Sequence, residues 1–283
     1  DFQGSLSGEM VDHGFLRQEG PFYRPVRRLE RWIDHQPAVI LHSSRNAAEH
    51  LRADFGVPER RLYSLPDFVN TRTFRPGLLD PAAVASERAA LGIPPGRRLV
   101  VYLGLLARHQ GTELLLEAAR RVVAERPDCH FLIMGFPGLP RYQALAQALG
   151  IGDHVTFTGR VPYEQAPARL ALGDLAVAPK IAETEGSGKL MNYMAMGLPT
   201  VAFDLPVCRE YLGEETPCVP AGDVGAFARA ILDLLADPAA AALAGRRLRQ
   251  RTEETYDWSR GAPILMAAYQ QALRSHDLRS AVA

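Results

Sequence analysis

Short apolar runs that alternate with amphipathic stretches are the feature that most limits how this chain can fold. From Arg98 onward, strand-like runs occupy residues 99–103, 130–134, 154–158, 175–178, 199–203 and 216–219. Helix-like stretches, such as residues 112–126 and 142–149, lie between them. Strands and helices in alternation predict an α/β fold with a doubly wound parallel sheet, whose ligands bind beyond the carboxyl ends of the strands.

The first part of the chain offers fewer elements of this kind. Strand-like runs near residues 38–42 and 61–65 flank one helix. A βαβ unit takes 30 or more residues, so the segment before Arg98 holds at most about three. We therefore expect a partial N-terminal α/β domain, whose first strand near Ala38 has an open edge that self-association or a separate fragment covers.

An amphipathic helix is expected at residues 24–35. It places Val26, Leu29 and Ile33 on one stripe and four arginines on the other. The favoured interpretation is a solvated basic face, and contact with an anionic membrane surface is the alternative. The domain boundaries that we expect are 1–76 for the N-terminal domain, 77–97 for a connection, 98–257 for a Rossmann-like domain, and 258–283 for a helix that crosses back.

A Gly-rich turn lies between a strand and a helix in residues 174–204. Ser187 is the expected N-cap of that helix, and Gly186 and Gly188 permit close approach of a ligand. Free backbone N–H groups and the helix dipole favour a phosphate there. The only two lysines of the chain, Lys180 and Lys189, lie beside this turn. The turn is not a P-loop, because neither the earlier Gly nor the Ser or Thr after the Lys is present.

Composition excludes several classes of protein. The formal net charge is zero and the sequence pI is about 7.3, which argues against a nucleic-acid partner. Three cysteines without C-x-x-C spacing favour neither a disulfide framework nor a zinc site. No D-x-D or H-x-x-x-H motif occurs, so we expect no metal. No apolar run is long enough to span a bilayer, and the expected location is cytoplasmic, with peripheral contact at the inner membrane face as the alternative.

The Gly-rich stretch resembles the nucleotide-sugar site of family 4 glycosyltransferases, which have the two-domain GT-B fold. That family shows an acidic residue, a Gly-rich turn and then a helix with the pattern E-Y/A-M-A-x-G-x-P-V-V. Glu185, Gly186, Gly188 and residues 192–199 stand here in that order. The resemblance implies a retaining, metal-independent enzyme that uses a UDP- or GDP-sugar as substrate and needs no further cofactor.

The resemblance also implies roles for individual residues. Glu185 would lie at the donor sugar and the reacting carbon, and Asn192, in place of a Glu, would contact the ribose. The turns at Gly135 and at Arg160 and Val161 would lie at the nucleotide, the latter two at the base.

The loop after the first strand of this domain departs from the family pattern G-R-L-x-x-x-K-G. Gly104 and Gly111 match, but Leu105 and Gln110 replace the Arg and the Lys that hold the diphosphate. The cations available to replace them are Arg108, Lys180 and Lys189.

We therefore expect transfer of a sugar from a nucleoside diphosphate to an acceptor hydroxyl of a glycan, a lipid or a small molecule. Because the phosphate cations are missing, a weakly active or non-catalytic nucleotide-sugar-binding module is an alternative, as is a GT-B-fold epimerase or phosphorylase. The dinucleotide fingerprint G-x-G-x-x-G is absent, so NAD is not an expected ligand.

Overall fold

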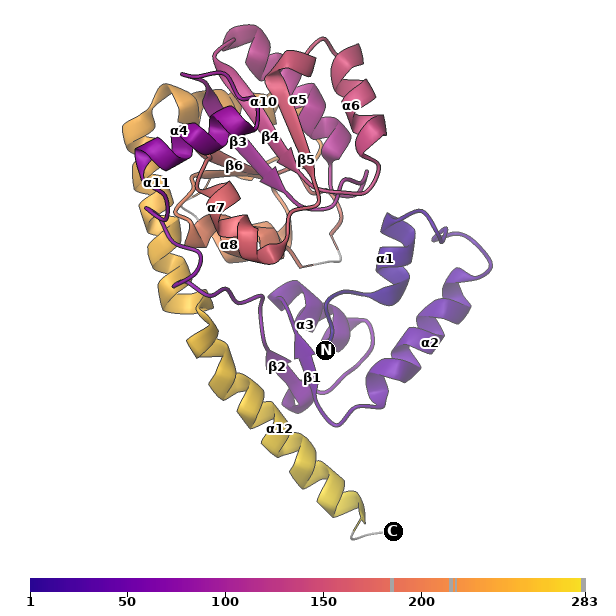
Figure 1. Ribbon diagram of the computed structural model, residues 1–283. Helices are drawn as coiled ribbons and strands as arrows, with labels where there is room; N and C mark the ends of the chain where they lie inside the picture. The colour runs from indigo at the N-terminus through magenta and orange to yellow at the C-terminus, as the bar shows by residue number, and fades with distance from the viewer. Residues whose placement is uncertain (184–185, 214–215, 217, 281–283) are drawn as a thin grey trace. The chain divides into compact units, whose positions relative to one another are not determined.

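The computed structural model describes residues 1–183, 186–213, 216 and 218–280, and its chain forms two compact units (Figure 1). The smaller unit comprises Asp1–Phe68, Ala182–Gly188 and Thr255–Ala283. The larger unit comprises Val69–Ile181 and Lys189–Glu254. The domain boundaries expected from the sequence remain predictions.

The larger unit is built on a six-stranded parallel sheet, as the sequence predicts. Its strands are β3 (Arg98–Leu103), β4 (Cys129–Met134), β5 (Val155–Gly159), β6 (Leu175–Ala178), β7 (Thr200–Phe203) and β8 (Cys218–Val219). Their order is β5-β4-β3-β6-β7-β8. The order reverses between β3 and β6, which is the topological switch point where doubly wound sheets bind ligands.

Helices connect these strands and cover both faces of the sheet. They are α4 (Pro81–Ala90), α5 (Thr112–Glu125), α6 (Leu139–Ala148), α7 (Ala166–Leu170), α8 (Gly188–Ala195), α9 (Pro206–Leu212), α10 (Val224–Ala236) and α11 (Pro238–Arg251). Short 3₁₀ turns at Gly152–His154 and Tyr163–Gln165 complete the unit, and a π turn at Thr252–Tyr256 follows α11. Helices α5, α6 and α10 pack on one face of the strands (Figure 1) and form the main hydrophobic core with them.

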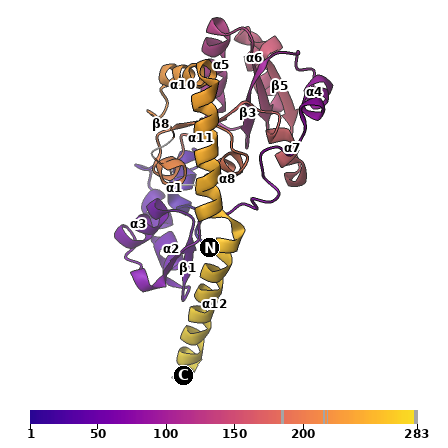
Figure 2. The same cartoon turned by 90° about the vertical axis from the view of Figure 1, so that its left-hand side faces the viewer.

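Helix α11 (Figure 2) passes close to the C-terminal end of α8, because a glycine allows the approach. A Cβ atom at Gly245 would overlap the carbonyl oxygen of Gly197. The guanidinium of Arg249 donates to the carbonyl oxygens of Ala195 and Phe74, each at 2.6 Å. A cation therefore satisfies a carbonyl at the C-terminal end of α8, where the helix dipole is negative.

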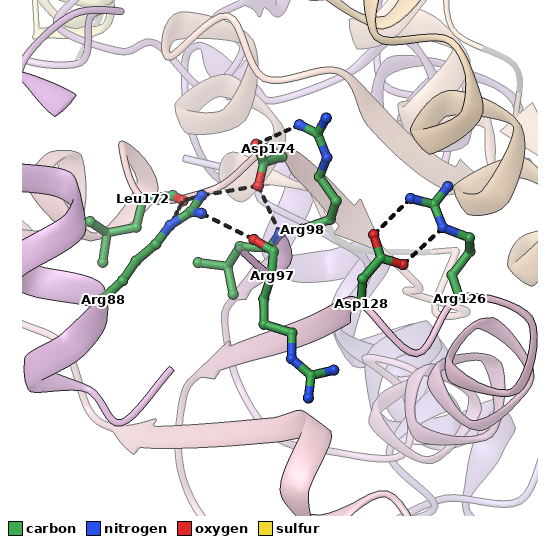
Figure 3. A network of polar contacts seen from close by, with 8 residues as sticks. Arg88, Arg97, Arg98, Arg126, Asp128, Leu172 and Asp174 are labelled. Carbon is green, nitrogen blue, oxygen red and sulfur yellow. Dashed lines mark hydrogen bonds and ion pairs between the residues drawn. The ribbon is translucent and has the colours of Figure 1, made fainter. Parts of the chain in front are cut away.

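A polar cluster fixes the amino ends of the strands, opposite the edge where ligands bind (Figure 3). One carboxylate oxygen of Asp174 accepts from the backbone N–H of Leu99 at 2.7 Å and from Arg88 at 3.0 Å. Arg98 lies 3.6 Å from the other oxygen. These contacts tie α4 to β3 and to the start of β6, so we assign the cluster a structural role.

The smaller unit contains α1 (Leu6–Asp12), α2 (Tyr23–His35), β1 (Ile40–His42), α3 (Arg45–Ala53), a 3₁₀ turn (Glu59–Arg61), β2 (Leu62–Ser64) and α12 (Trp258–Ser280). Strands β1 and β2 pair in parallel. The sequence predicts that the first strand has an open edge. This prediction is wrong for the middle of β1, because another segment bonds to it there. Phe2 donates to the carbonyl oxygen of Leu41 at 2.7 Å and accepts from Ser43 at 3.3 Å, on the side of β1 opposite β2.

Helix α2 does not bury the apolar stripe that the sequence predicts, but the neighbouring face that carries Glu30 and Asp34. Leu29 and Ile33 are 51% and 43% exposed, whereas Glu30 and Asp34 are 2% and 8% exposed. Glu30 accepts hydrogen bonds from the backbone N–H and the hydroxyl of Ser7. The prediction failed because this carboxylate satisfies a free N–H group at the N-terminus of α1.

Helix α12 begins at Trp258, where the sequence analysis starts its C-terminal helix. Pro263 lies inside it, where a proline costs one backbone hydrogen bond but has not ended the helix. Among the described residues, no helix combines the length and the apolar character that crossing a bilayer requires.

Candidate functional site

Two loops meet at the switch point between β3 and β6. Gly111 has φ +73°, and a Cβ atom there would overlap the carbonyl oxygen of Pro179. The backbone N–H of Ile181 donates to the carbonyl oxygen of His109 at 3.0 Å. The loop after β3 and the loop after β6 therefore touch where a doubly wound sheet presents its ligand site.

Lys189, at the start of α8, reaches this place with its ammonium group. Its Nζ atom donates to Oε1 of Gln110 at 2.6 Å and to the hydroxyl of Tyr102 at 3.4 Å. A Cβ atom at Gly104 would lie 3.0 Å from both Cε and Nζ of the lysine. Gly104 thus leaves the room that the lysine occupies, and this ammonium lies at the loop from which the family's Lys is missing.

Two buried tyrosines hold this arrangement, and the sequence analysis missed both. The hydroxyl of Tyr193 on α8 accepts from the backbone N–H of Leu103 at 2.7 Å and donates to its carbonyl oxygen at 3.2 Å. The hydroxyl of Tyr102 donates to the carbonyl oxygen of Leu105 at 2.7 Å. Burial raises the pKa of both hydroxyls, so they remain protonated donors at neutral pH.

The turn after β4 packs directly on the loop after β3. A Cβ atom at Gly135 would overlap the carbonyl oxygen of Gly104. Leu106 donates its backbone N–H to the carbonyl oxygen of Phe136 at 2.8 Å. The structure therefore brings Gly104, Gly111 and Gly135 together with Lys189. At each glycine, the absence of a side chain lets a neighbouring backbone or side chain come close.

The remaining cations of the prediction lie in different surroundings. Arg108 and Arg160 are exposed and Val161 is partly buried. Lys180 is completely buried, and its role as a cation of the site stays a prediction. It lies two residues after the end of the buried strand β6.

The Gly-rich turn before α8 differs from the prediction in two respects. Ser187 is 3% exposed, and its hydroxyl oxygen has no hydrogen-bond partner among the described residues, so the predicted capping bond is not formed. Cβ atoms at Gly186 and Gly188 would lie 3.1 and 3.5 Å from Oδ2 of Asp67. A carboxylate of the chain itself therefore faces the glycines that the sequence assigned to a ligand.

Glu185 and Asn192 are the residues predicted to contact the sugars of the ligand. Glu185 lies outside the described residues and remains a prediction. Asn192 is partly buried on α8, and its side-chain amide makes no hydrogen bond to the described part of the chain. That amide keeps both its donor and its acceptor for a ligand. In the described ranges, no group of three or more His, Cys, Asp and Glu side chains could hold a metal ion.

Comparison with known proteins identifies the larger unit. Residues 97–237 match the family described as glycosyl transferases group 1. A GDP-mannose-dependent alpha-(1-6)-phosphatidylinositol monomannoside mannosyltransferase of Mycolicibacterium smegmatis is 33% identical over 253 residues, which cover 85% of this chain and 64% of that protein. A 2-deoxystreptamine glucosyltransferase of Streptomyces kanamyceticus is 26% identical, covering 88% and 64%. The chain thus spans about 64% of the length of these relatives.

Solved structures support the fold. A sucrose-phosphate synthase from Thermosynechococcus elongatus superposes with a TM-score of 0.78 at 23% identity, covering 94% of this chain and 66% of that one. The Anabaena protein HepE, in complex with UDP-glucose, gives a TM-score of 0.78 at 15% identity, covering 98% and 71%. The predicted GT-B-like α/β fold is confirmed.

Proposed function

Because the chain belongs to the group 1 glycosyl transferases, we propose that it transfers a sugar from a nucleoside-diphosphate donor to an acceptor hydroxyl. The bond between the anomeric carbon and the donor phosphate breaks, and a bond to the acceptor oxygen forms. The acceptor's proton ends on the leaving diphosphate or in solvent. Retention of anomeric configuration is part of the proposal and rests on the resemblance of residues 185–199 to family 4.

The observation that carries the proposal is the ammonium of Lys189 at the switch point. In this reaction negative charge builds up on the departing diphosphate, so the main task of the site is to stabilise that charge. Lys189 contacts Gln110 and Tyr102, which are neutral and fix its position. We propose that this side chain, with the N-terminus of α8, binds the diphosphate without a metal ion.

The other residues have supporting roles in the proposal. Gly104, Gly111 and Gly135 shape the loops, and Arg108 is exposed on the first of them as a second cation. Asn192 contacts the ribose, Arg160 and Val161 lie at the base, and Glu185 lies at the donor sugar. Gly186, Ser187 and Gly188 form the turn that precedes Lys189.

The experiment is incubation with a panel of UDP-, GDP- and ADP-sugars, with and without simple sugar and polyol acceptors, while release of nucleoside diphosphate is followed. We expect the wild type to release nucleoside diphosphate from at least one donor. The Lys189→Ala variant is the comparison and should lose this release. Binding of nucleotide without release from any donor would contradict transfer and favour the non-catalytic binding module.

A further inference from the structure

A cavity of about 280 Å³ lies at the amino ends of the strands, away from the edge of the sheet that Lys189 reaches. Its walls come from the start of β3, the turn before β6, the turn between α8 and β7, and the turn between α10 and α11. All of these segments belong to the larger unit. The volume equals that of about nine water molecules in the liquid, so the cavity has room for a small organic molecule.

The walls of this cavity are mainly apolar. Residues 234–235 are leucines in the last turn of α10, Pro238 begins α11, and residues 198–199 lead into β7. The described residues that line the cavity include only two charged side chains, Arg98 and Asp174. A hydrocarbon group that enters the cavity would therefore lose contact with water and bind favourably.

Arg98 has hydrogen-bonding capacity to spare at this cavity. Its guanidinium lies 3.6 Å from Oδ1 of Asp174, an ion pair that is too long for a good hydrogen bond (Figure 3). The shorter contacts of Asp174 go to Arg88 and to the N–H of Leu99, both through the other oxygen. Within the described ranges the guanidinium of Arg98 donates no hydrogen bond, and 45% of the side chain is exposed. Its planar N–H groups are therefore available to a ligand.

The charges around Arg98 determine which head group fits. Arg88 and Arg98 carry two positive charges and Asp174 carries one negative charge, so this cluster has one positive charge in excess. Asp128 is paired with Arg126 and adds no net charge. A carboxylate neutralises the excess charge and matches the planar fork of a guanidinium. A phosphate monoester carries nearly two negative charges at neutral pH, so Asp174 would repel its second charge.

We propose that this cavity binds a small amphipathic carboxylate, with its head group on Arg98 and its hydrocarbon part against residues 198–199 and 234–235. The site is distinct from the proposed donor site. Lys189 lies beyond the carboxyl end of β3, whereas Arg98 begins that strand. The six residues of β3 span about 20 Å, so one ligand at each site can bind at the same time.

Calorimetric titration of the whole chain with acetate, octanoate and octylammonium tests the site. Octanoate should bind at least tenfold more tightly than acetate, which lacks the hydrocarbon part, and at least tenfold more tightly than octylammonium, which Arg98 repels. Arg98→Gln should weaken octanoate at least tenfold, because a charge-assisted hydrogen bond is lost. Lys189→Ala should bind octanoate like the wild type, because the two sites are separate.

Ala242→Phe supplies a second test that leaves Arg98 in place. Ala242 lines the cavity from α11 and is exposed, so a phenyl ring there should occupy the cavity and abolish octanoate binding. Ala240→Phe is the matched control, because Ala240 is exposed on the same helix and does not line the cavity. The proposal is overturned if the wild type binds octanoate no more tightly than acetate, or if Arg98→Gln binds it like the wild type. It is also overturned if Ala242→Phe binds octanoate as tightly as Ala240→Phe does.

Discussion

The ammonium of Lys189 donates a hydrogen bond of 2.6 Å to the side-chain oxygen of Gln110. The family pattern that this loop resembles has a Lys at the position of Gln110. A second ammonium at this distance from Lys189 would repel it, whereas an amide oxygen accepts its proton. The amide at position 110 and the ammonium at position 189 are therefore electrostatically compatible neighbours.

Lys189 and Asn192 should contribute to different parts of the ligand. Lys189→Ala should weaken UDP or GDP at least tenfold and leave uridine or guanosine nearly unchanged, because a charge-assisted hydrogen bond to phosphate contributes about 1.5–3 kcal/mol. Asn192→Ala should weaken nucleoside and nucleoside diphosphate alike and leave pyrophosphate unchanged. Calorimetry with these ligands measures both patterns. If both variants lost the same affinity for every ligand, this division of roles between Lys189 and Asn192 would be wrong.

Gly104 and Gly135 should respond differently to the same change. A Cβ atom at Gly104 meets mainly the flexible end of Lys189 at 3.0 Å, so Gly104→Ala should fold but displace the ammonium and weaken UDP binding. A Cβ atom at Gly135 meets backbone, so Gly135→Ala should destabilise the larger unit by about 2 kcal/mol or more. Denaturant unfolding and UDP titration separate the two effects. Equal stability of the two variants would count against this packing.

Tyr193 should matter for stability through its hydroxyl alone. The ring is completely buried, and its hydroxyl bonds both the N–H and the carbonyl oxygen of Leu103. Tyr193→Phe removes one partner and leaves both backbone groups unpaired, at a cost of about 1–3 kcal/mol. Urea unfolding of the variant and the wild type measures this loss of stability. Tyr269→Phe is the control, because Tyr269 is 59% exposed, and a loss of the same size there would contradict the assignment.

The fold of the larger unit was predictable because its signals are local. Each strand is a short apolar run followed by a turn, and the observed strands begin or end within two residues of the predicted ones. Helices α7 and α9 were missed, since each has only a few residues and begins close to a proline. Short segments carry too little periodicity to be identified.

The candidate site was predictable only in part. The sequence indicated the glycines and Lys189, because their residue types and their places after strands carry the signal. It could not indicate that Lys189 contacts Gln110 or that Tyr193 bonds Leu103, since these partners lie about 80 to 90 residues apart along the chain. For α2, the apolar pattern was read correctly, but the Ser7 partner of Glu30 decided which face is buried.

The buried carboxylate of Asp34 on α2 should make the smaller unit less stable at neutral pH. Burial, reinforced by the nearby charge of Glu30, raises the pKa of Asp34 from 3.8 to about 6. The folded state then holds a proton that the unfolded state has released between about pH 4 and pH 6. Stability therefore falls as pH rises through this window and is constant above it.

Asp34→Asn removes this titration and should flatten the pH profile. At pH 8 the variant should be more stable than the wild type by about 2–3 kcal/mol, since one pKa unit corresponds to about 1.4 kcal/mol, and at pH 4 the two should be nearly equal. Urea unfolding at several pH values, followed by the fluorescence of Trp32 in a Trp258→Phe background, measures the difference on α2 itself. Asp12→Asn, at an exposed aspartate on α1, is the control and should keep the wild-type profile. If Asp34→Asn retains the fall in stability between pH 4 and pH 6, another group carries the titration and the assignment to Asp34 is wrong.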